Sequence, residues 1–173
     1  MTDSTTVKSP IGTLLVESDG RAITQITLPG KFTQRASMSP TSSNSNNKTE
    51  NENSAVLSRA VRQLDEYFAG KRTEFDLPLE LEGTAFQKDV WLALAEIPYG
   101  KTISYAELAS MVGRPSAFRA VGQANGANPI PIVLPCHRVI ASGGGIGGYG
   151  GGLEMKRRLL ALEGVDGSVP VSK

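Results

Sequence analysis

The sequence has few of the residues on which many functions depend: its 173 positions include one cysteine and one histidine, and only 6% are aromatic. A single cysteine excludes an internal disulfide. No apolar run approaches the ~20 residues that cross a bilayer, and the polar start at residues 1–6 differs from a secretory signal peptide. We therefore expect a soluble, intracellular protein made of one domain or two small ones.

The charge of the chain is nearly balanced, with a formal value of +1. Its distribution is uneven, because residues 1–83 carry 9 Lys/Arg against 11 Asp/Glu, whereas residues 84–173 carry 9 against 6. The basic excess in the second half suits a modest, salt-sensitive contact with phosphates. An ordinary solvated surface explains the same numbers, so the charge alone does not decide between the two.

The first half has the pattern of a small antiparallel sheet. Short apolar segments predict strands over residues 5–10, 12–18 and 22–28. Asp19-Gly20 lies between the last two and is a strong hairpin signal, because glycine adopts a positive φ without steric cost.

A polar segment and a helix follow this sheet. Residues 37–54 are almost wholly Ser, Asn, Thr, Glu and Lys, and we interpret them as a mobile loop because they cannot bury enough surface to offset their ordering entropy. Ser54 then caps a helix that ends at Gly70 and covers the sheet. The apolar residues of this helix follow the helical period: Leu57, Val61, Leu64 and Phe68.

The second half predicts helices. Thr84 to Gln87 is a capping-box pattern that begins a helix, and Ser104 to Glu107 is another. Residues 113–115 (Gly-Arg-Pro) predict a turn, and residues 116–124 a second short helix, so that the pair forms a helix-turn-helix. The helix-turn-helix signal is weak by itself, because many helical domains contain such a pair of helices.

A last helix is expected from Leu153 to Glu163.

The expected fold class is therefore α+β with two domains. The first, over residues 1–82, is a small antiparallel sheet with a covering helix and the loop at 37–54. The second, over residues 83–173, is mostly helical and contains a winged-helix-like helix-turn-helix.

The lone cysteine and the lone histidine are adjacent, at Cys136 and His137, between two β-branched apolar runs. A thiol is a useful nucleophile only as thiolate, and a nearby imidazole helps it to ionise. Adjacent side chains of an extended segment point to opposite faces, so direct contact would need a turn, and Pro135 could break the strand there. A water relay between ring and sulfur is the better interpretation. A buried, inert thiol beside a surface histidine is the plain alternative.

The run from Asn128 to Val139, Asn-Pro-Ile-Pro-Ile-Val-Leu-Pro-Cys-His-Arg-Val, resembles the active-site segment of the O6-alkylguanine-DNA alkyltransferases. The resemblance extends over residues 84–164 and more loosely into the N-terminal part. It implies a DNA repair protein that moves an alkyl group from O6-alkylguanine, and less readily from O4-alkylthymine, irreversibly to its own Cys136. Each molecule would react once.

The resemblance also implies a role for each catalytic residue. His137, oriented by Glu163, would take the thiol proton through water and so lower the effective pKa of the thiol. Tyr105 matches the tyrosine that protonates the departing guanine. Asn128 matches the asparagine that braces the turn around the cysteine.

DNA would contact the second helix of the helix-turn-helix, which lies in the minor groove in this family. Arg119 matches the arginine that fills the space left by the flipped nucleotide. The other expected DNA contacts are small residues of the two helices: Ser104, Ala117, Ala120 and Gly122. Close helix–helix packing is the alternative explanation for small residues here.

The flipped base would enter a pocket formed by Val139, Tyr149 and Gly150. Many relatives carry serine where this chain has Gly150, which predicts one hydrogen-bond donor fewer and more tolerance for bulky alkyl groups. The glycine-rich run at 143–152 also contains the spacing Gly-x-Gly-x-x-Gly. A dinucleotide fold needs a further strand with an acidic residue ~20 residues on, which this chain lacks, so we reject that interpretation.

The resemblance implies no cofactor and no metal, since the N-terminal part lacks the cysteines and histidines that hold zinc in some relatives. It implies a monomer that acts on double-stranded DNA with alkylated guanine, in the cytoplasm or, in a eukaryote, the nucleus, without contact with a membrane; cooperative binding stays open. Two other functions remain as alternatives: a Cys-His-Glu hydrolase, and a lesion-binding or winged-helix regulatory protein without catalysis.

Overall fold

The computed structural model describes residues 3–29, 50–141, 146–149 and 151–165, the side chains of residues 50–54 excepted. The chain divides into two compact units, Met1–Glu80 and Leu81–Lys173. The expected boundary between residues 82 and 83 lies close to this division. Among the described residues, no helix is both long enough and apolar enough to cross a membrane.

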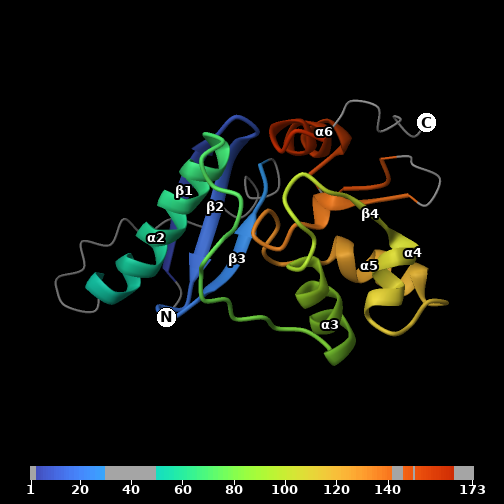
Figure 1. The fold of residues 1–173 in the computed structure, drawn as a ribbon. Helices are drawn as coiled ribbons and strands as arrows, with labels where there is room; N and C mark the ends of the chain where they lie inside the picture. Colours follow the sequence, from blue (N-terminus) through green and yellow to red (C-terminus); the bar gives the residue numbers. More distant parts are fainter. Residues whose placement is uncertain (1–2, 30–49, 142–145, 150, 166–173) are drawn as a thin grey trace. The chain divides into compact units, whose positions relative to one another are not determined.

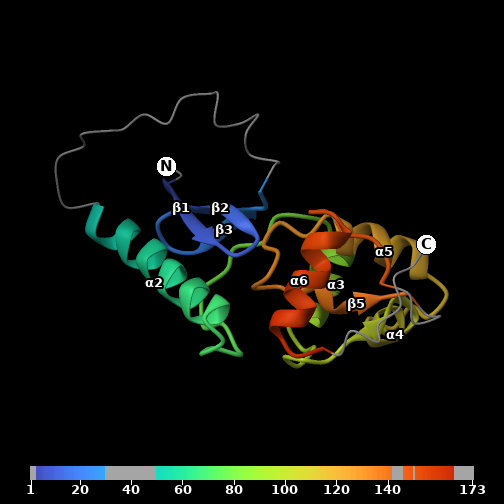
Figure 2. The same ribbon diagram turned by 90° about the horizontal axis from the view of Figure 1, so that it is seen from above.

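The N-terminal unit is an antiparallel sheet covered by one helix, as expected. Strands β1 (Asp3–Ser9), β2 (Gly12–Ser18) and β3 (Ile23–Thr27) lie in the order β1-β2-β3, and α2 (Glu50–Phe68) runs across them (Figures 1 and 2). The predicted hairpin is confirmed: Asp19 Oδ1 accepts hydrogen bonds from the amides of Arg21 and Ala22, and Gly20 has φ +96°.

Helix α2 differs from its prediction at its start and along its face. It begins at Glu50 rather than Ser54, so the predicted loop was wrong for residues 50–54, because an established helix extends cheaply into polar sequence. Residues 37–49 of that loop lie outside the described residues. The buried face is also rotated: Val61 and Phe68 are half-buried, and the buried apolar side chains are Leu57, Ala60, Leu64 and Tyr67.

The C-terminal unit is mostly helical, as predicted. Its elements in chain order are α3 (Ala85–Leu94), β4 (Ile103–Ser104), α4 (Tyr105–Met111), α5 (Phe118–Gly126), η1 (Cys136–Arg138, a 3-10 turn), β5 (Val139–Ile140) and α6 (Leu153–Leu162). Both capping boxes are confirmed, with Thr84 and Gln87 starting α3 and with Ser104 and Glu107 starting α4.

The helix-turn-helix consists of α4 and α5, which pack against each other. Gly113 makes the turn between them at φ +74°. Helix α5 begins at Phe118 rather than Ser116, and the residues before it form a turn in which the amide of Ala117 donates to the carbonyl of Arg114. The helix continues through Gly126, two residues beyond its predicted end.

A parallel pair of short strands places the cysteine segment beside the first helix of this motif. In it, Ile103 pairs with Val139 and Ser104 with Ile140. Since β5 directly follows the 3-10 turn and α4 directly follows β4, the cysteine and the start of α4 are held close together.

Trp91 links α3 to the second helix of the motif. Its side chain is buried, and its indole Nε1 donates a 2.8 Å hydrogen bond to the carbonyl of Ala124. The same carbonyl also accepts the amide of Ala127 at 3.1 Å, so the indole is one of its two donors.

We expect Trp91→Phe to lower the free energy of unfolding by at least about 1 kcal/mol, because it removes the donor and leaves space in the core. Denaturant unfolding followed by circular dichroism measures this loss. Leu92→Ala on the same helix is the control, since Leu92 is 58% exposed and should change stability little. Equal losses in the two variants would contradict the role of the tryptophan.

Candidate active site

The cysteine lies in a tight turn rather than in an extended segment. Residues 132–133 already form a turn, closed by a bridge between Pro131 and Leu134, and residues 136–138 form the 3-10 turn η1. The amide of Cys136 donates to the carbonyl of Leu134 at 2.7 Å, and the amide of Arg138 donates to the carbonyl of Pro135 at 3.0 Å. The expected extended segment was therefore wrong at and before the cysteine, and a strand, β5, begins only at Val139.

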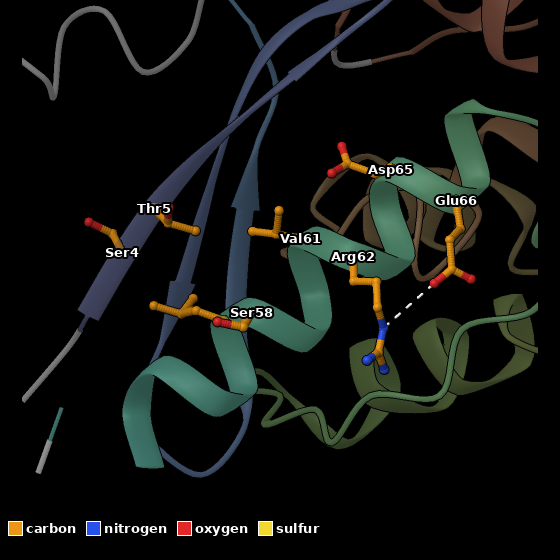
Figure 3. A pocket seen from close by; sticks show the side chains of 8 residues that line it. Ser4, Thr5, Ser58, Val61, Arg62, Asp65 and Glu66 are labelled. Atoms are coloured by element: carbon orange, nitrogen blue, oxygen red, sulfur yellow. Dashed lines mark ion pairs between the residues drawn. The ribbon is translucent and has the colours of Figure 1, made fainter. Parts of the chain in front are cut away.

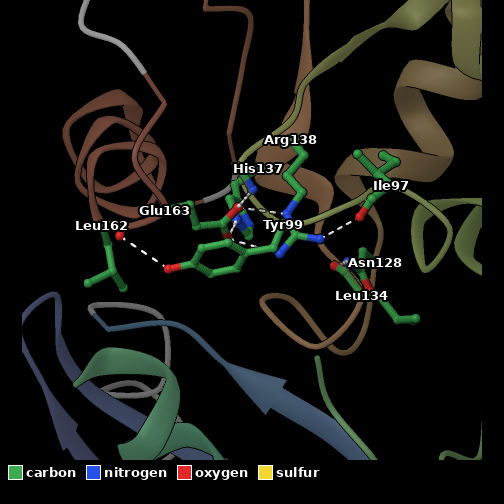
Figure 4. A network of polar contacts seen from close by, with 9 residues as sticks. Ile97, Tyr99, Asn128, Leu134, His137, Arg138, Leu162 and Glu163 are labelled. Atoms are coloured by element: carbon green, nitrogen blue, oxygen red, sulfur yellow. Dashed lines mark hydrogen bonds and ion pairs between the residues drawn. The ribbon is translucent and has the colours of Figure 1, made fainter. Parts of the chain in front are cut away.

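Asn128 holds the loop that leads to this turn. Its Nδ2 donates to the carbonyl of Leu134 at 2.7 Å, and its Oδ1 accepts from the amide of Ile130 at 2.9 Å (Figure 4). Between them Ile132 has φ +76°, which is strained for a β-branched residue. The side chain thus replaces missing backbone pairing in a strained loop, which is the geometry that a brace requires.

Cys136 is buried, with 6% of its surface exposed. Burial raises the pKa of its thiol from 9.0 to about 11, against the opposing effects of a hydrogen bond from Asn128 and the charge of Lys156. In the resting protein the sulfur is therefore a neutral thiol. The expected lowering of the thiol pKa was wrong for this state, because exclusion of water outweighs the nearby cation.

His137 and Glu163 are brought together from 26 positions apart, as the resemblance implied. The Nε2 atom of His137 lies 2.6 Å from Oε2 of Glu163, and both side chains are fully buried (Figure 4). Burial lowers the pKa of His137 below its usual 6.5, although Glu163 acts in the opposite direction. The imidazole is therefore neutral near pH 7.

Glu163 is not paired with His137 alone, and the sequence interpretation missed its second partner, Arg138. Its Nε donates to Oε1 of Glu163 at 2.8 Å, and its Nη2 donates to Oε2 at 3.1 Å. Its Nη1 donates to the carbonyl of Ile97 at 2.6 Å. The available sequence signal was an arginine directly before the apolar pair Val139-Ile140, although a count of charges alone assigns it to the surface.

Lys156 was also missed as a site residue. It is fully buried, and its Nζ donates to the carbonyls of Val139 at 2.6 Å and Gly148 at 3.0 Å. Burial lowers its pKa to about 8, while the thiolate form of Cys136 would raise it. This ammonium group is the cation that lowers the thiol pKa. No sequence signal distinguished it from the neighbouring arginines at 157 and 158.

Tyr105 lies close to the glycine-rich segment. A Cβ added to Gly147 would approach its hydroxyl oxygen to 3.0 Å, and one added to Gly122 would lie 3.7 Å from its ring. Burial raises the pKa of Tyr105, partly offset by a hydrogen bond with the backbone of Gly148; the charge of Cys136 acts with burial. The phenol is therefore protonated at neutral pH and can donate.

Two of the three expected pocket residues fall within the described part of the chain. Val139 is buried, directly after η1. The hydroxyl of Tyr149 is buried without a partner among the described residues, and burial raises its pKa well above 10, with the charge of Cys136 acting in the same direction. Gly150 lies outside the described residues, as do positions 142–145 of the same glycine-rich segment.

The predicted DNA contacts lie on or near α4 and α5. Arg119 and Ala120 are exposed, whereas Ala117 and Gly122 are half-buried. Ser104 is half-buried, and its hydroxyl accepts the amide of Glu107 as the cap of α4. Arg119 is thus free to reach a ligand on the outer face of the helix.

The N-terminal unit carries a groove of about 620 Å³ between β1 and α2 (Figure 3). Thr5, Leu57 and Val61 contribute its apolar surface. Its rim includes an ion pair of 3.6 Å between Arg62 and Glu66. No cysteine or histidine lines it, so we assign it no part in the chemistry.

Fold and site together define a class of protein that combines a helix-turn-helix unit with a buried cysteine–histidine–glutamate site. Family models cover both units. Residues 4–81 match the 6-O-methylguanine DNA methyltransferase, ribonuclease-like domain, and residues 85–165 match the DNA-binding domain of the same name. The chain belongs to the 6-O-methylguanine DNA methyltransferase family, and the resemblance found in its sequence is confirmed.

Individual relatives agree along nearly the whole chain. A methylated-DNA–protein-cysteine methyltransferase of Mycolicibacterium paratuberculosis is 47% identical, with 94% of this chain and 93% of the relative covered. The constitutive one of Bacillus subtilis is 44% identical, with 92% and 93% covered.

Solved structures show the same similarity. The Mycobacterium tuberculosis O6-methylguanine methyltransferase has a TM-score of 0.79 at 45% identity, covering 94% of this chain and 93% of that one. The structure of Mycobacterium tuberculosis OGT in complex with DNA has a TM-score of 0.76 at 47% identity, covering 91% and 90%.

We expect the Cys136 thiol to titrate near pH 11, because burial disfavours the thiolate. The difference in absorbance at 240 nm between the wild type and Cys136→Ser, followed from pH 6 upward, reports this one thiol. A midpoint at or below the ordinary value of 9.0 would show that the cation, rather than burial, dominates.

Proposed function

We propose that this chain repairs DNA by transferring the alkyl group of O6-alkylguanine to its own Cys136 in one irreversible step. The observation that carries the proposal is the buried Cys136 followed directly by His137, which Glu163 contacts at 2.6 Å, in a member of this family. O4-alkylthymine is the poorer substrate. The product is a thioether, which water does not cleave, so each molecule acts once.

His137 is the base that receives the thiol proton. Its Nε2 faces Glu163, so the neutral ring carries its proton on Nε2, donates a hydrogen bond to the carboxylate and leaves Nδ1 unprotonated. Nδ1 is buried and has no hydrogen-bond partner among the described residues. A water between Nδ1 and the sulfur completes the relay, and the lowered pKa of His137 keeps the ring ready to accept.

The transfer forms a bond between sulfur and the alkyl carbon, while the bond between that carbon and O6 breaks. The electron pair of the broken bond stays with guanine, which takes a proton from the Tyr105 hydroxyl. The proton lost by Cys136 passes through water to His137 and then to solvent, from which Tyr105 is reprotonated. Lys156 stabilises the negative charge that develops on sulfur.

Double-stranded DNA is the partner, and α5 is the element that meets it in the minor groove. Arg119 lies exposed on this helix, where it can fill the space of a nucleotide flipped toward Val139 and Tyr149. The protein acts as a monomer in the compartment that holds the DNA, the cytoplasm of a prokaryote or the nucleus of a eukaryote.

Incubation with O6-benzylguanine tests the reaction directly. We expect the intact mass to rise by one benzyl group per chain, and peptide mapping to place it on Cys136. Cys136→Ser should gain no mass, since its hydroxyl is a far weaker nucleophile. Conversion of more than one O6-benzylguanine per protein molecule would contradict the single-use mechanism and favour a Cys-His-Glu hydrolase.

Arg119→Ala should slow repair of duplex DNA containing O6-methylguanine by roughly tenfold or more, because loss of the inserted side chain removes more than ~1.4 kcal/mol from the flipped complex. Reaction with the free benzylated base should stay unchanged, since no gap has to be filled. Rate constants on both substrates measure this difference. Equal losses on both would mean that the substitution damages the fold.

A further inference from the structure

Arg138 is a fully enclosed cation that the proposed reaction does not use. Only 5% of its surface is exposed, and it lies between the end of α3 and the end of α6. Every guanidinium nitrogen has an acceptor, two on Glu163 and one on the carbonyl of Ile97. The guanidinium carbon also lies 5.7 Å from the centre of the Tyr99 ring (Figure 4).

The pairing occupies both oxygens of Glu163. Oε1 accepts Nε of Arg138 and also the amide of Gly100 at 3.2 Å, whereas Oε2 accepts Nη2 and faces His137. Such a bidentate contact fixes the plane of the carboxylate and favours its ionised form. The orientation of the His137 ring therefore depends on Arg138 through Glu163.

The positive charge of Arg138 affects where protons bind in the site. A buried carboxylate beside a histidine, with no other cation, draws a proton onto the imidazole or onto itself. A protonated imidazole cannot accept the thiol proton. A protonated carboxyl group is a poorer acceptor for the hydrogen bond from Nε2, so it no longer fixes the orientation of the ring. With Arg138 present the negative charge is already balanced, so His137 can stay neutral.

We propose that Arg138 is a positioning residue for the transfer: it holds Glu163 ionised and oriented, and it leaves His137 neutral so that Nδ1 can accept the Cys136 proton. This inference rests on the proposed alkyl transfer. It adds a residue outside the cysteine, histidine and glutamate to the set that determines when the protein can react.

The groups that face His137 all bear on its protonation. Burial lowers the pKa of His137, Glu163 raises it, and Arg138 and Lys156 lower it. The neutral thiol of Cys136 precedes it in η1, and Tyr99 lies against the guanidinium. Replacing Arg138 with a neutral residue therefore raises the pKa of His137 and moves the acidic limb of the pH–rate profile to higher pH.

The test is the rate of reaction with free O6-benzylguanine from pH 5.5 to 9, measured by intact mass, which avoids any effect on DNA binding. Arg138→Gln should shift the acidic limb upward by about 1 unit or more, slow the reaction by up to about tenfold at pH values below the limb, and approach the wild-type rate at pH 9. Arg138→Lys keeps the cation and should leave the limb near its wild-type position.

Arg158→Gln is the matched control, because Arg158 is an exposed residue that pairs with Glu154 on α6. Its profile should overlay that of the wild type. A uniform loss of rate at every pH in Arg138→Gln would overturn the proposal and leave a purely structural role. Failure of the wild type itself to gain the benzyl group would refute the proposed function instead.

A second comparison holds even if Arg138→Gln is unstable. In Glu163→Gln the carboxylate through which Arg138 acts is absent, so adding Arg138→Gln should cause no further loss of rate. The double variant removes both charges of the buried pair together, which favours its folding. Losses that multiply in the double variant would show that Arg138 acts independently of Glu163, and the proposal would fail.

Discussion

The structure of the site depends on one buried carboxylate. Glu163, at the end of α6, contacts His137 and Arg138 in the cysteine turn and the amide of Gly100 after α3. Since an ion removed from water must find its partners within the protein, these three segments are held in a single arrangement. Breaking such a pair on one side typically costs about 3–5 kcal/mol, so the site and the fold of this unit are stabilised together.

Burial has opposite effects on the acids and bases around this carboxylate. It raises the pKa of the Cys136 thiol to about 11, lowers that of His137, and lowers that of Lys156 to about 8. Each shift favours the neutral form, because a low-dielectric interior disfavours charge of either sign. The resting thiol is thereby neutral, and in the proposed transfer charge develops on sulfur only as His137 takes the proton. A neutral resting thiol suits the single use that we propose for it.

Local sequence signals predicted the elements that local forces form. The Asp19-Gly20 hairpin and both capping boxes, at Thr84 and Ser104, depend on contacts within four residues, and all were found. The errors arose where neighbours in space decide. Helix α2 packs on the sheet and buries Tyr67 rather than Phe68.

The sequence by itself singled out the proposed nucleophile, since the chain has one cysteine, and it determined the family through the run that ends in Pro-Cys-His-Arg-Val. Only the tertiary structure decided that Arg138 and Lys156 are buried and that the resting thiol is neutral. The physical reason is that the energy of a charge depends on the water excluded from it and on partners distant in the chain. Neither quantity can be read from the order of the residues.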